Sequence, residues 1–195
     1  MKRNLKLAWY EVLWQRPFEL SAVYDLLTLL ASTTPRGPVI WEVRGQNNKV
    51  RFLVGTFPCY SRIVHEIFRA NGKVRFSAIS DAERTPMTIV RRLKISKPSL
   101  SLKTDAALSA IRSGLAAMSR LPRDVTATLQ VVFGPAYAPT RTPQKIADPH
   151  ATWYDYIIGS VGEASAESLA NIRSKTLQHG FYATIRVGIS DSTKS

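Results

Sequence analysis

Apolar and polar residues alternate along the first eighty residues in an order that predicts strand, helix, strand, strand, helix, strand. A period-2 pattern rich in aromatic residues runs from Leu7 to Trp14 and is typical of a partly buried strand. Apolar residues at helical spacing predict a helix from Glu19 to Ala31. The other expected elements are strands at Val39–Arg44, Lys49–Val54 and Lys73–Ile79, a hairpin at Gly45-Gln46-Asn47-Asn48, and a helix that Pro58 opens and Asn71-Gly72 closes. This order is that of a ferredoxin-like fold, which hosts many functions and fixes none.

A similar order begins again after Pro86, although no residue-level repeat accompanies it. The segment Thr152–Ser160 is apolar but short, so either a strand or a helix fits it. We expect an α+β protein with two ferredoxin-like (βαββαβ-type) halves, residues 1–83 and 84–195. The second half has a degenerate or displaced third strand and a long Pro-rich loop at 134–150. Its expected elements are strands at Met87–Ile95, Val125–Phe133 and Phe181–Ile189 and helices at Thr104–Met118 and about Ala166–His179.

Composition points to a soluble, strongly basic protein. The chain has 195 residues, and 27 Lys and Arg against 14 Asp and Glu give a net charge of +13. Such a charge attracts nucleic acid or an anionic membrane surface, or alternatively keeps the chain soluble or meets an acidic partner. The single cysteine, Cys59, fits a reducing compartment, and no apolar run approaches the roughly 18–20 residues of a bilayer span. We expect a cytoplasmic protein that reaches the inner face of the cell membrane through partners.

Basic residues gather on one side of the predicted sheet. Alternation places apolar residues such as Trp41 and Val54 on one face and mainly Lys and Arg on the other. If two helices cover the apolar face, the opposite face carries a basic cluster, which the next strand and the Pro-rich loop extend. The candidate nucleic-acid-binding residues are therefore Arg44, Lys49, Arg51, Lys73, Arg75, Arg92, Lys94, Arg141 and Lys145.

Catalytic motifs are not found in the sequence. Gly72-Lys73 is followed by Val74 and lacks the earlier glycine of a phosphate-binding loop, G-x-x-x-x-G-K-[ST]. The three histidines have no metal-ligand spacing, and the third strand lacks the glycine of RNA-recognition domains. We expect no catalytic residue, no metal and no cofactor. One alternative is a small enzyme with a site near residues 134–165 that gathers Asp148, His150 and Asp155.

Several strings resemble a known family. Pro38–Arg44 followed by Val50–Gly55 looks like the N-terminal module of bacterial type IV secretion or conjugative DNA-transfer ATPases of the coupling-protein type. The helix start Glu19–Val23 is also similar, and Ile172–Lys175 followed by Gly180–Val187 resembles the closing stretch of that module. The resemblance implies that the hydrolytic machinery lies downstream, so no catalytic residue is carried over. The family's usual N-terminal membrane span is not seen in this sequence.

We therefore expect a non-catalytic accessory module of a DNA-transfer ATPase, either separately expressed or a relative without its motor. Its partners are the ATPase or other secretion-system proteins and, through the basic surface, DNA. No small-molecule substrate is apparent. The alternative is a stand-alone nucleic-acid-binding protein with a ferredoxin-like fold.

Overall fold

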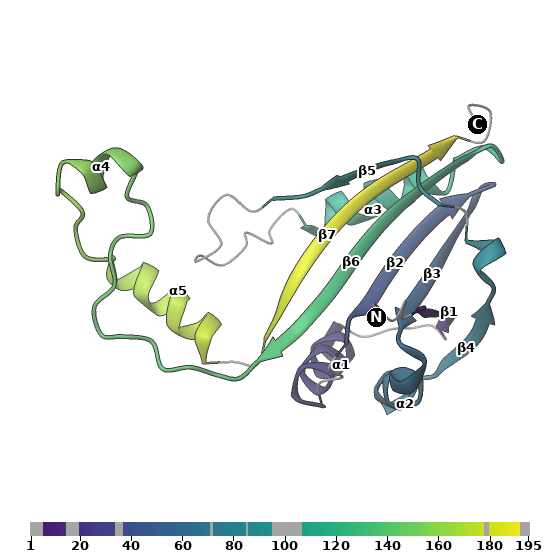
Figure 1. Cartoon of the computed structure of the whole chain (residues 1–195), viewed down its shortest axis with the longest axis horizontal. Coiled ribbons are helices and arrows are strands. Elements are labelled where there is room, and N and C mark those ends of the chain that lie inside the picture. The colour runs from purple at the N-terminus through teal and green to yellow at the C-terminus, as the bar shows by residue number, and fades with distance from the viewer. Residues whose placement is uncertain are drawn as a thin grey trace, which may run out of the picture.

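The computed structural model describes residues 6–14, 20–33, 37–70, 72–84, 86–94, 107–177 and 180–191. These residues form a mixed α+β fold with one open antiparallel sheet of seven strands and five α-helices (Figure 1). The expected α+β class is therefore confirmed. The strands are β1 (Ala8–Trp14), β2 (Val39–Gln46), β3 (Lys49–Thr56), β4 (Val74–Ile79), β5 (Ile89–Arg92), β6 (Val125–Tyr137) and β7 (Gly180–Asp191). The α-helices are α1 (Leu20–Thr33), α2 (Ser61–Ala70), α3 (Ala107–Met118), α4 (Trp153–Ile157) and α5 (Ala166–Thr176).

The sheet has the strand order β4-β1-β3-β2-β6-β7-β5. Asn47 and Asn48 join β2 to β3 with φ angles of 51° and 56°, the left-handed backbone of a tight two-residue hairpin. The expected division into two ferredoxin-like halves is not confirmed. Strand β6 pairs with β2 from Val39↔Phe133 to Gln46↔Thr126, so one continuous sheet runs through both parts of the chain. The boundary between residues 83 and 84 stays a prediction.

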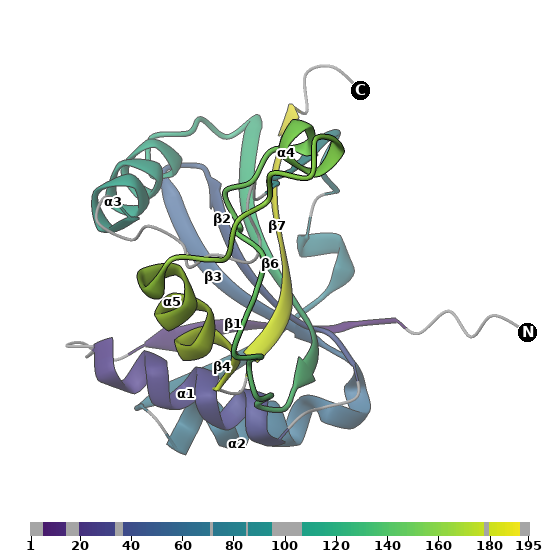
Figure 2. The same cartoon turned by 90° about the vertical axis from the view of Figure 1, so that its left-hand side faces the viewer.

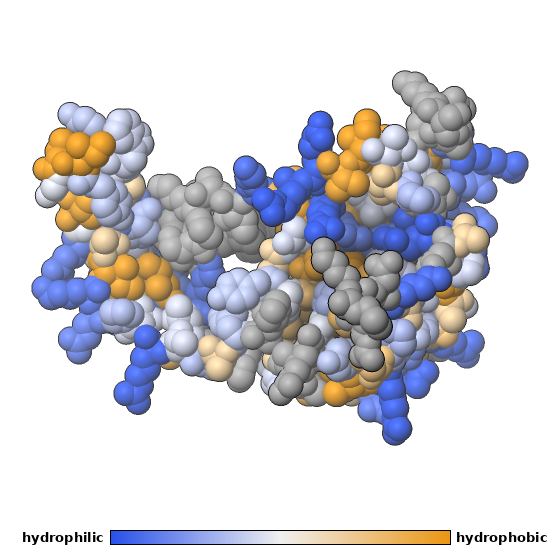
Figure 3. Space-filling view, viewed as in Figure 1, coloured by the Kyte–Doolittle hydropathy of each residue, from blue (hydrophilic) through white to orange (hydrophobic). Residues whose placement is uncertain are grey.

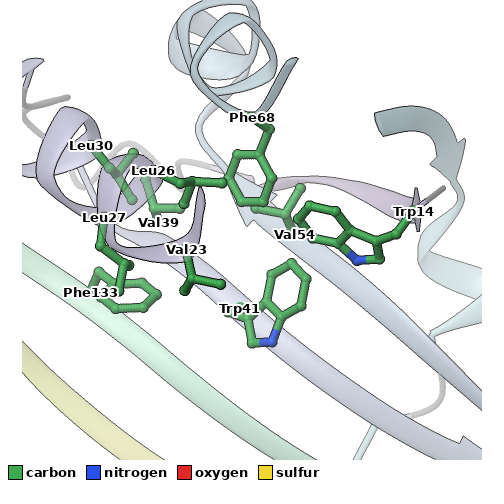
Figure 4. Close-up of a pocket in the computed structure, with 10 residues that line it drawn as sticks. All are labelled: Trp14, Val23, Leu26, Leu27, Leu30, Val39, Trp41, Val54, Phe68 and Phe133. Carbon is green, nitrogen blue, oxygen red and sulfur yellow. The ribbon is translucent and has the colours of Figure 1, made fainter. Parts of the chain in front are cut away.

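Helices α1 and α2 pack side by side against one face of the sheet and bury the main core. Their apolar positions recur at helical spacing, so Leu26, Leu30, Val64 and Phe68 all face the strands. A groove of about 260 Å³ lies between α1, α2 and the sheet (Figure 4). Its lining is entirely apolar: Trp14, Val23, Leu26, Leu27, Leu30, Val39, Trp41, Val54, Phe68 and Phe133.

Helix α3 lies near the opposite end of β2 and β3 from α1 and α2 (Figure 2). Gly45 of β2 permits this contact, because a Cβ atom there would lie 2.7 Å from the backbone oxygen of Met118. The helical side of the sheet is therefore covered at both ends of these strands.

The connection from β4 to β5 has to reach from one outer strand of the sheet to the other. We call residues 80–84 and 86–88 the strap. Its contacts show that it crosses the face opposite α1 and α2. Arg84 lies over the Trp9 ring of β1, 3.8 Å from the ring centre, and the Thr88 N–H donates to the Ile189 carbonyl of β7 at 3.1 Å. This face is therefore partly covered by the strap.

Residues 138–177 form an arm that projects from the end of the sheet where β6 ends and β7 begins (Figure 1). Backbone hydrogen bonds join its two sides, including Ala164 N–H to the Ile146 carbonyl at 2.8 Å. The segment left undecided between strand and helix contains α4, which begins with a capping box between Thr152 and Asp155. The hydrogen bonds that Thr152 donates lower the pKa of Asp155, and the bond from its backbone N–H has the largest effect. The arm is thus a locally stabilised unit.

His65 of α2 gives the fold a testable pH dependence. Its ring lies 4.3 Å from the Tyr10 ring and 4.0 Å from the Phe76 ring, measured between centres. Burial, and then the nearby Arg69, lower the pKa of His65 below its usual value of 6.5.

We expect the free energy of unfolding to be constant above about pH 6.5 and to fall below it, towards the lower pKa of the folded state. The unfolded chain takes up a proton in this interval that folded His65 does not. Urea unfolding at a series of pH values measures the effect, and a His65→Gln variant should lack this component. An unchanged pH dependence in the variant would contradict the assignment.

Candidate nucleic-acid interface

The candidate site lies on the sheet face away from α1 and α2, which we call the arginine face. The strand register places one row of residues across all seven strands on this face. From β5 to β4 the row is Arg92, Arg186, Gln130, Glu42, Leu53, Glu11 and Ser77. The next row brings Arg44 and Arg51 directly opposite each other on β2 and β3. Acidic and basic residues therefore meet in the middle of the sheet.

Glu42 is the centre of a buried charge network. It is completely buried, and its carboxylate accepts hydrogen bonds from Arg44 Nε at 3.0 Å, from Arg84 at 2.7 Å and from Gln130 at 2.9 Å. Arg44 itself is only 3% exposed. Burial lowers the pKa of Arg44, and the carboxylate of Glu42 opposes this shift. Arg44 therefore takes part in a structural ion pair beneath the surface.

Arg51 is also bonded to carboxylates. Its guanidinium donates to both oxygens of Glu11, at 3.0 and 2.8 Å, and lies 3.9 Å from Glu83 of the strap. The bidentate hydrogen bond to Glu11 raises the pKa of Arg51. The middle of the arginine face is thus largely neutralised, because distant acidic residues converge on the two central arginines.

The other candidate cations are exposed but lie in separate places. Lys145 of the arm pairs with Glu163 at 2.7 Å. The remaining six form no ion pair with the residues that the structure describes: Lys49, Lys73, Arg75, Arg92, Lys94 and Arg141. They lie at the β2–β3 hairpin, at the β4 edge, at the β5 edge and in the arm. The nine candidates therefore do not form one cluster.

A group of exposed cations lies at the β5 edge of the sheet. Arg92 of β5 is directly opposite Arg186 of β7, with Arg91 and Lys94 as neighbours in the chain. All four side chains are exposed. Figure 3 shows hydrophilic side chains over part of β5, with exposed hydrophobic ones beside them. We call these four residues the β5-edge cations.

Two arginines of the arginine face were not predicted from the sequence. Arg84 and Arg186 were not among the candidates, although both lie on the arginine face. A usable signal was Glu42 in the middle of an apolar strand, because a buried carboxylate needs a cationic partner. The sequence did not predict that Arg84 is a partner of Glu42, because this contact depends on the path of the strap.

Two acidic residues of the alternative enzyme site, Asp148 and Asp155, have local structural roles. Asp148 accepts a hydrogen bond from the backbone N–H of His150 at 2.9 Å, and Asp155 caps α4. Among the described residues, no group of three or more His, Cys, Asp or Glu is placed to hold a metal ion.

No helix in the described ranges is long and apolar enough to cross a membrane. Comparisons with protein-family models, curated proteins and solved structures found no match.

Proposed function

We propose that the chain is a non-catalytic accessory module of a bacterial DNA-transfer ATPase that guides DNA and docks to partner proteins. The observation that carries the DNA role is the group of β5-edge cations, which are exposed and lie on adjacent strands. Phosphate contacts need such exposed guanidinium and ammonium groups. The strings that resemble the coupling-protein family support the transfer context. The first six elements, with the order β4-β1-β3-β2, are proposed to be a ferredoxin-like unit.

Docking is assigned to the tip of the arm. Helix α4 and the residue after it expose Trp153, Tyr154, Tyr156, Ile157 and Ile158, each at least 55% exposed. Exposed aromatic and aliphatic groups that lie together are typical of protein interfaces. The tip lies away from the sheet (Figure 1), so a partner bound there would leave the β5 edge accessible.

DNA binding should depend on the β5-edge cations and on salt. We expect the binding constant to fall log-linearly as salt rises from about 50 to about 200 mM, because phosphate contacts release counterions. Arg92→Gln with Lys94→Gln should weaken binding and reduce the slope by about 2, roughly one per lost contact. Fluorescence anisotropy with a labelled oligonucleotide measures both quantities.

The matched control is Arg112→Gln with Arg120→Gln, which removes the same charge at α3 and the turn that follows it. This control should keep the salt slope of the unmodified protein. Equal losses in the two double variants would contradict the β5-edge assignment. If no binding is seen at about 50 mM salt, the DNA role is removed and protein docking alone is left. The stand-alone nucleic-acid-binding alternative predicts the same DNA result without a requirement for the arm.

A further inference from the structure

We propose that a pocket beneath the strap is a binding site for a phosphate group. The pocket has a volume of about 280 Å³, close to the lower limit of roughly 300 Å³ for typical small-ligand pockets. Its polar lining is formed by Glu42, Arg84, Thr128, Gln130 and Arg186. These residues come from the strap, β2, β6 and β7. The inference concerns a single, partly open anion site that shares only Arg186 with the β5-edge cations, and it does not rest on the role in DNA transfer.

The pocket exists because the strap passes over a position without a side chain. Gly188 of β7 lies directly opposite Thr128 of β6, and both line the pocket. A Cβ atom on Gly188 would lie 2.8 Å from Cγ of Met87, so the strap approaches the sheet closely here. Met87 and Pro86 therefore cover one side of a space that Val90 and Val187 also line, together with five polar residues.

The charges of the pocket favour an anion. Arg84 and Arg186 both line it, whereas Glu42 is the only acidic residue of the lining. The carboxylate of Glu42 is already shared among Arg44, Arg84 and Gln130. Arg186 forms no ion pair with any residue in the described ranges. The positive charge of Arg186 thus lies beside the pocket without a carboxylate of its own.

Two residues that line the pocket each have a buried polar atom without a hydrogen-bond partner. The two atoms are Nε of Arg84 and Oγ1 of Thr128, and Thr128 is only 4% exposed. Buried polar groups in proteins are nearly always satisfied, so each of these atoms calls for a partner. An oxyanion bound between Arg84 and Thr128 would accept from both donors and so account for the two unpaired atoms together.

The guanidinium of Arg84 is held in place before a ligand arrives. It lies 3.8 Å from the centre of the Trp9 ring and donates to Glu42 at 2.7 Å. A fixed guanidinium loses little side-chain entropy on binding. Donors from the strap, from β6 and from β7 approach the space from separate elements. A phosphate, with several oxygens in a tetrahedral arrangement, meets such donors better than a planar carboxylate does.

Inorganic phosphate is the probe for a first test. Isothermal titration at constant ionic strength should show saturable binding to the full chain. Arg186→Gln should weaken it about tenfold or more, because a charge-assisted hydrogen bond is lost. Thr128→Val keeps the side-chain shape and should weaken it about threefold or more through the lost hydroxyl. Arg75→Gln, which removes a free arginine at the β4 edge, should bind phosphate like the unmodified protein.

The source of the phosphate is resolved by competition. A nucleoside monophosphate and an oligonucleotide are each added to the phosphate-loaded protein and to its variant Arg92→Gln with Lys94→Gln; displacement by either one that is the same in both proteins supports the pocket and names the source. Circular dichroism melting confirms that each variant is folded. The proposal is overturned if no saturable binding occurs up to about 10 mM phosphate, or if Arg75→Gln weakens binding as much as Arg186→Gln does.

Discussion

Replacing Glu42 with alanine is expected to lower the free energy of unfolding by about 3–5 kcal/mol. The side chain is fully buried, and its removal leaves Arg44, which is 3% exposed, without the carboxylate that its Nε contacts at 3.0 Å. A buried charge that loses its partner keeps its desolvation cost and loses the attraction that offset it. Arg84 and Gln130 lose an acceptor as well. Urea unfolding followed by circular dichroism measures the change.

The matched control is Glu66→Ala, which breaks an exposed pair with Arg62 on α2 and should change stability little. Replacing both buried partners, Glu42→Leu with Arg44→Met, should recover much of the loss, because no unpaired charge then remains between these two positions. A loss of less than about 1 kcal/mol in Glu42→Ala would show that the network contributes little to the fold.

The second large effect is expected at Leu30. This residue of α1 is 1% exposed and lines the apolar groove between the helices and the sheet (Figure 4). Leu30→Ala should cost about 2–5 kcal/mol of unfolding free energy, because it removes buried apolar surface and enlarges a space that is already hollow. The neighbouring Leu29→Ala, at a position 39% exposed, should cost less than about 1 kcal/mol. Equal effects on the midpoint of urea unfolding would contradict this packing of α1.

Local patterns were sufficient for most of the elements that the structure describes. The alternation from Leu7 to Trp14 corresponds to β1, and the expected hairpin has its two asparagines in left-handed backbone. The short segment at 152–160 was ambiguous because five helical residues carry hardly any periodicity. Its capping box, Thr152 with Asp155, was the readable signal for a helix start.

Pairing between distant parts of the chain was not predictable in the same way. Alternation assigns each residue of β2 to a face but does not say that β6 adds beside it. The prediction of the candidate site was limited in the same way, because contacts between distant parts of the chain determine it. A basic face was expected around Arg44 and Arg51, and the register does place these two opposite each other. The acidic partners Glu11 and Glu83 come from other elements, so their arrival depends on the tertiary fold.

The arm is inserted between β6 and β7, two interior strands joined by the pairing that runs from Val125↔Asp191 to Tyr137↔Gly180. Both strands enter the arm at the same end of this ladder, next to its register irregularity between Phe133 and Ala136. Traction on the tip away from the body would therefore pull β6 and β7 in the same direction, and it would load in shear the backbone hydrogen bonds that join β6 to β2 and β7 to β5. A bound partner that pulls on the tip would thus act on the sheet through β2 and β5, while the outer strand β4, which pairs with β1, would carry none of that force directly.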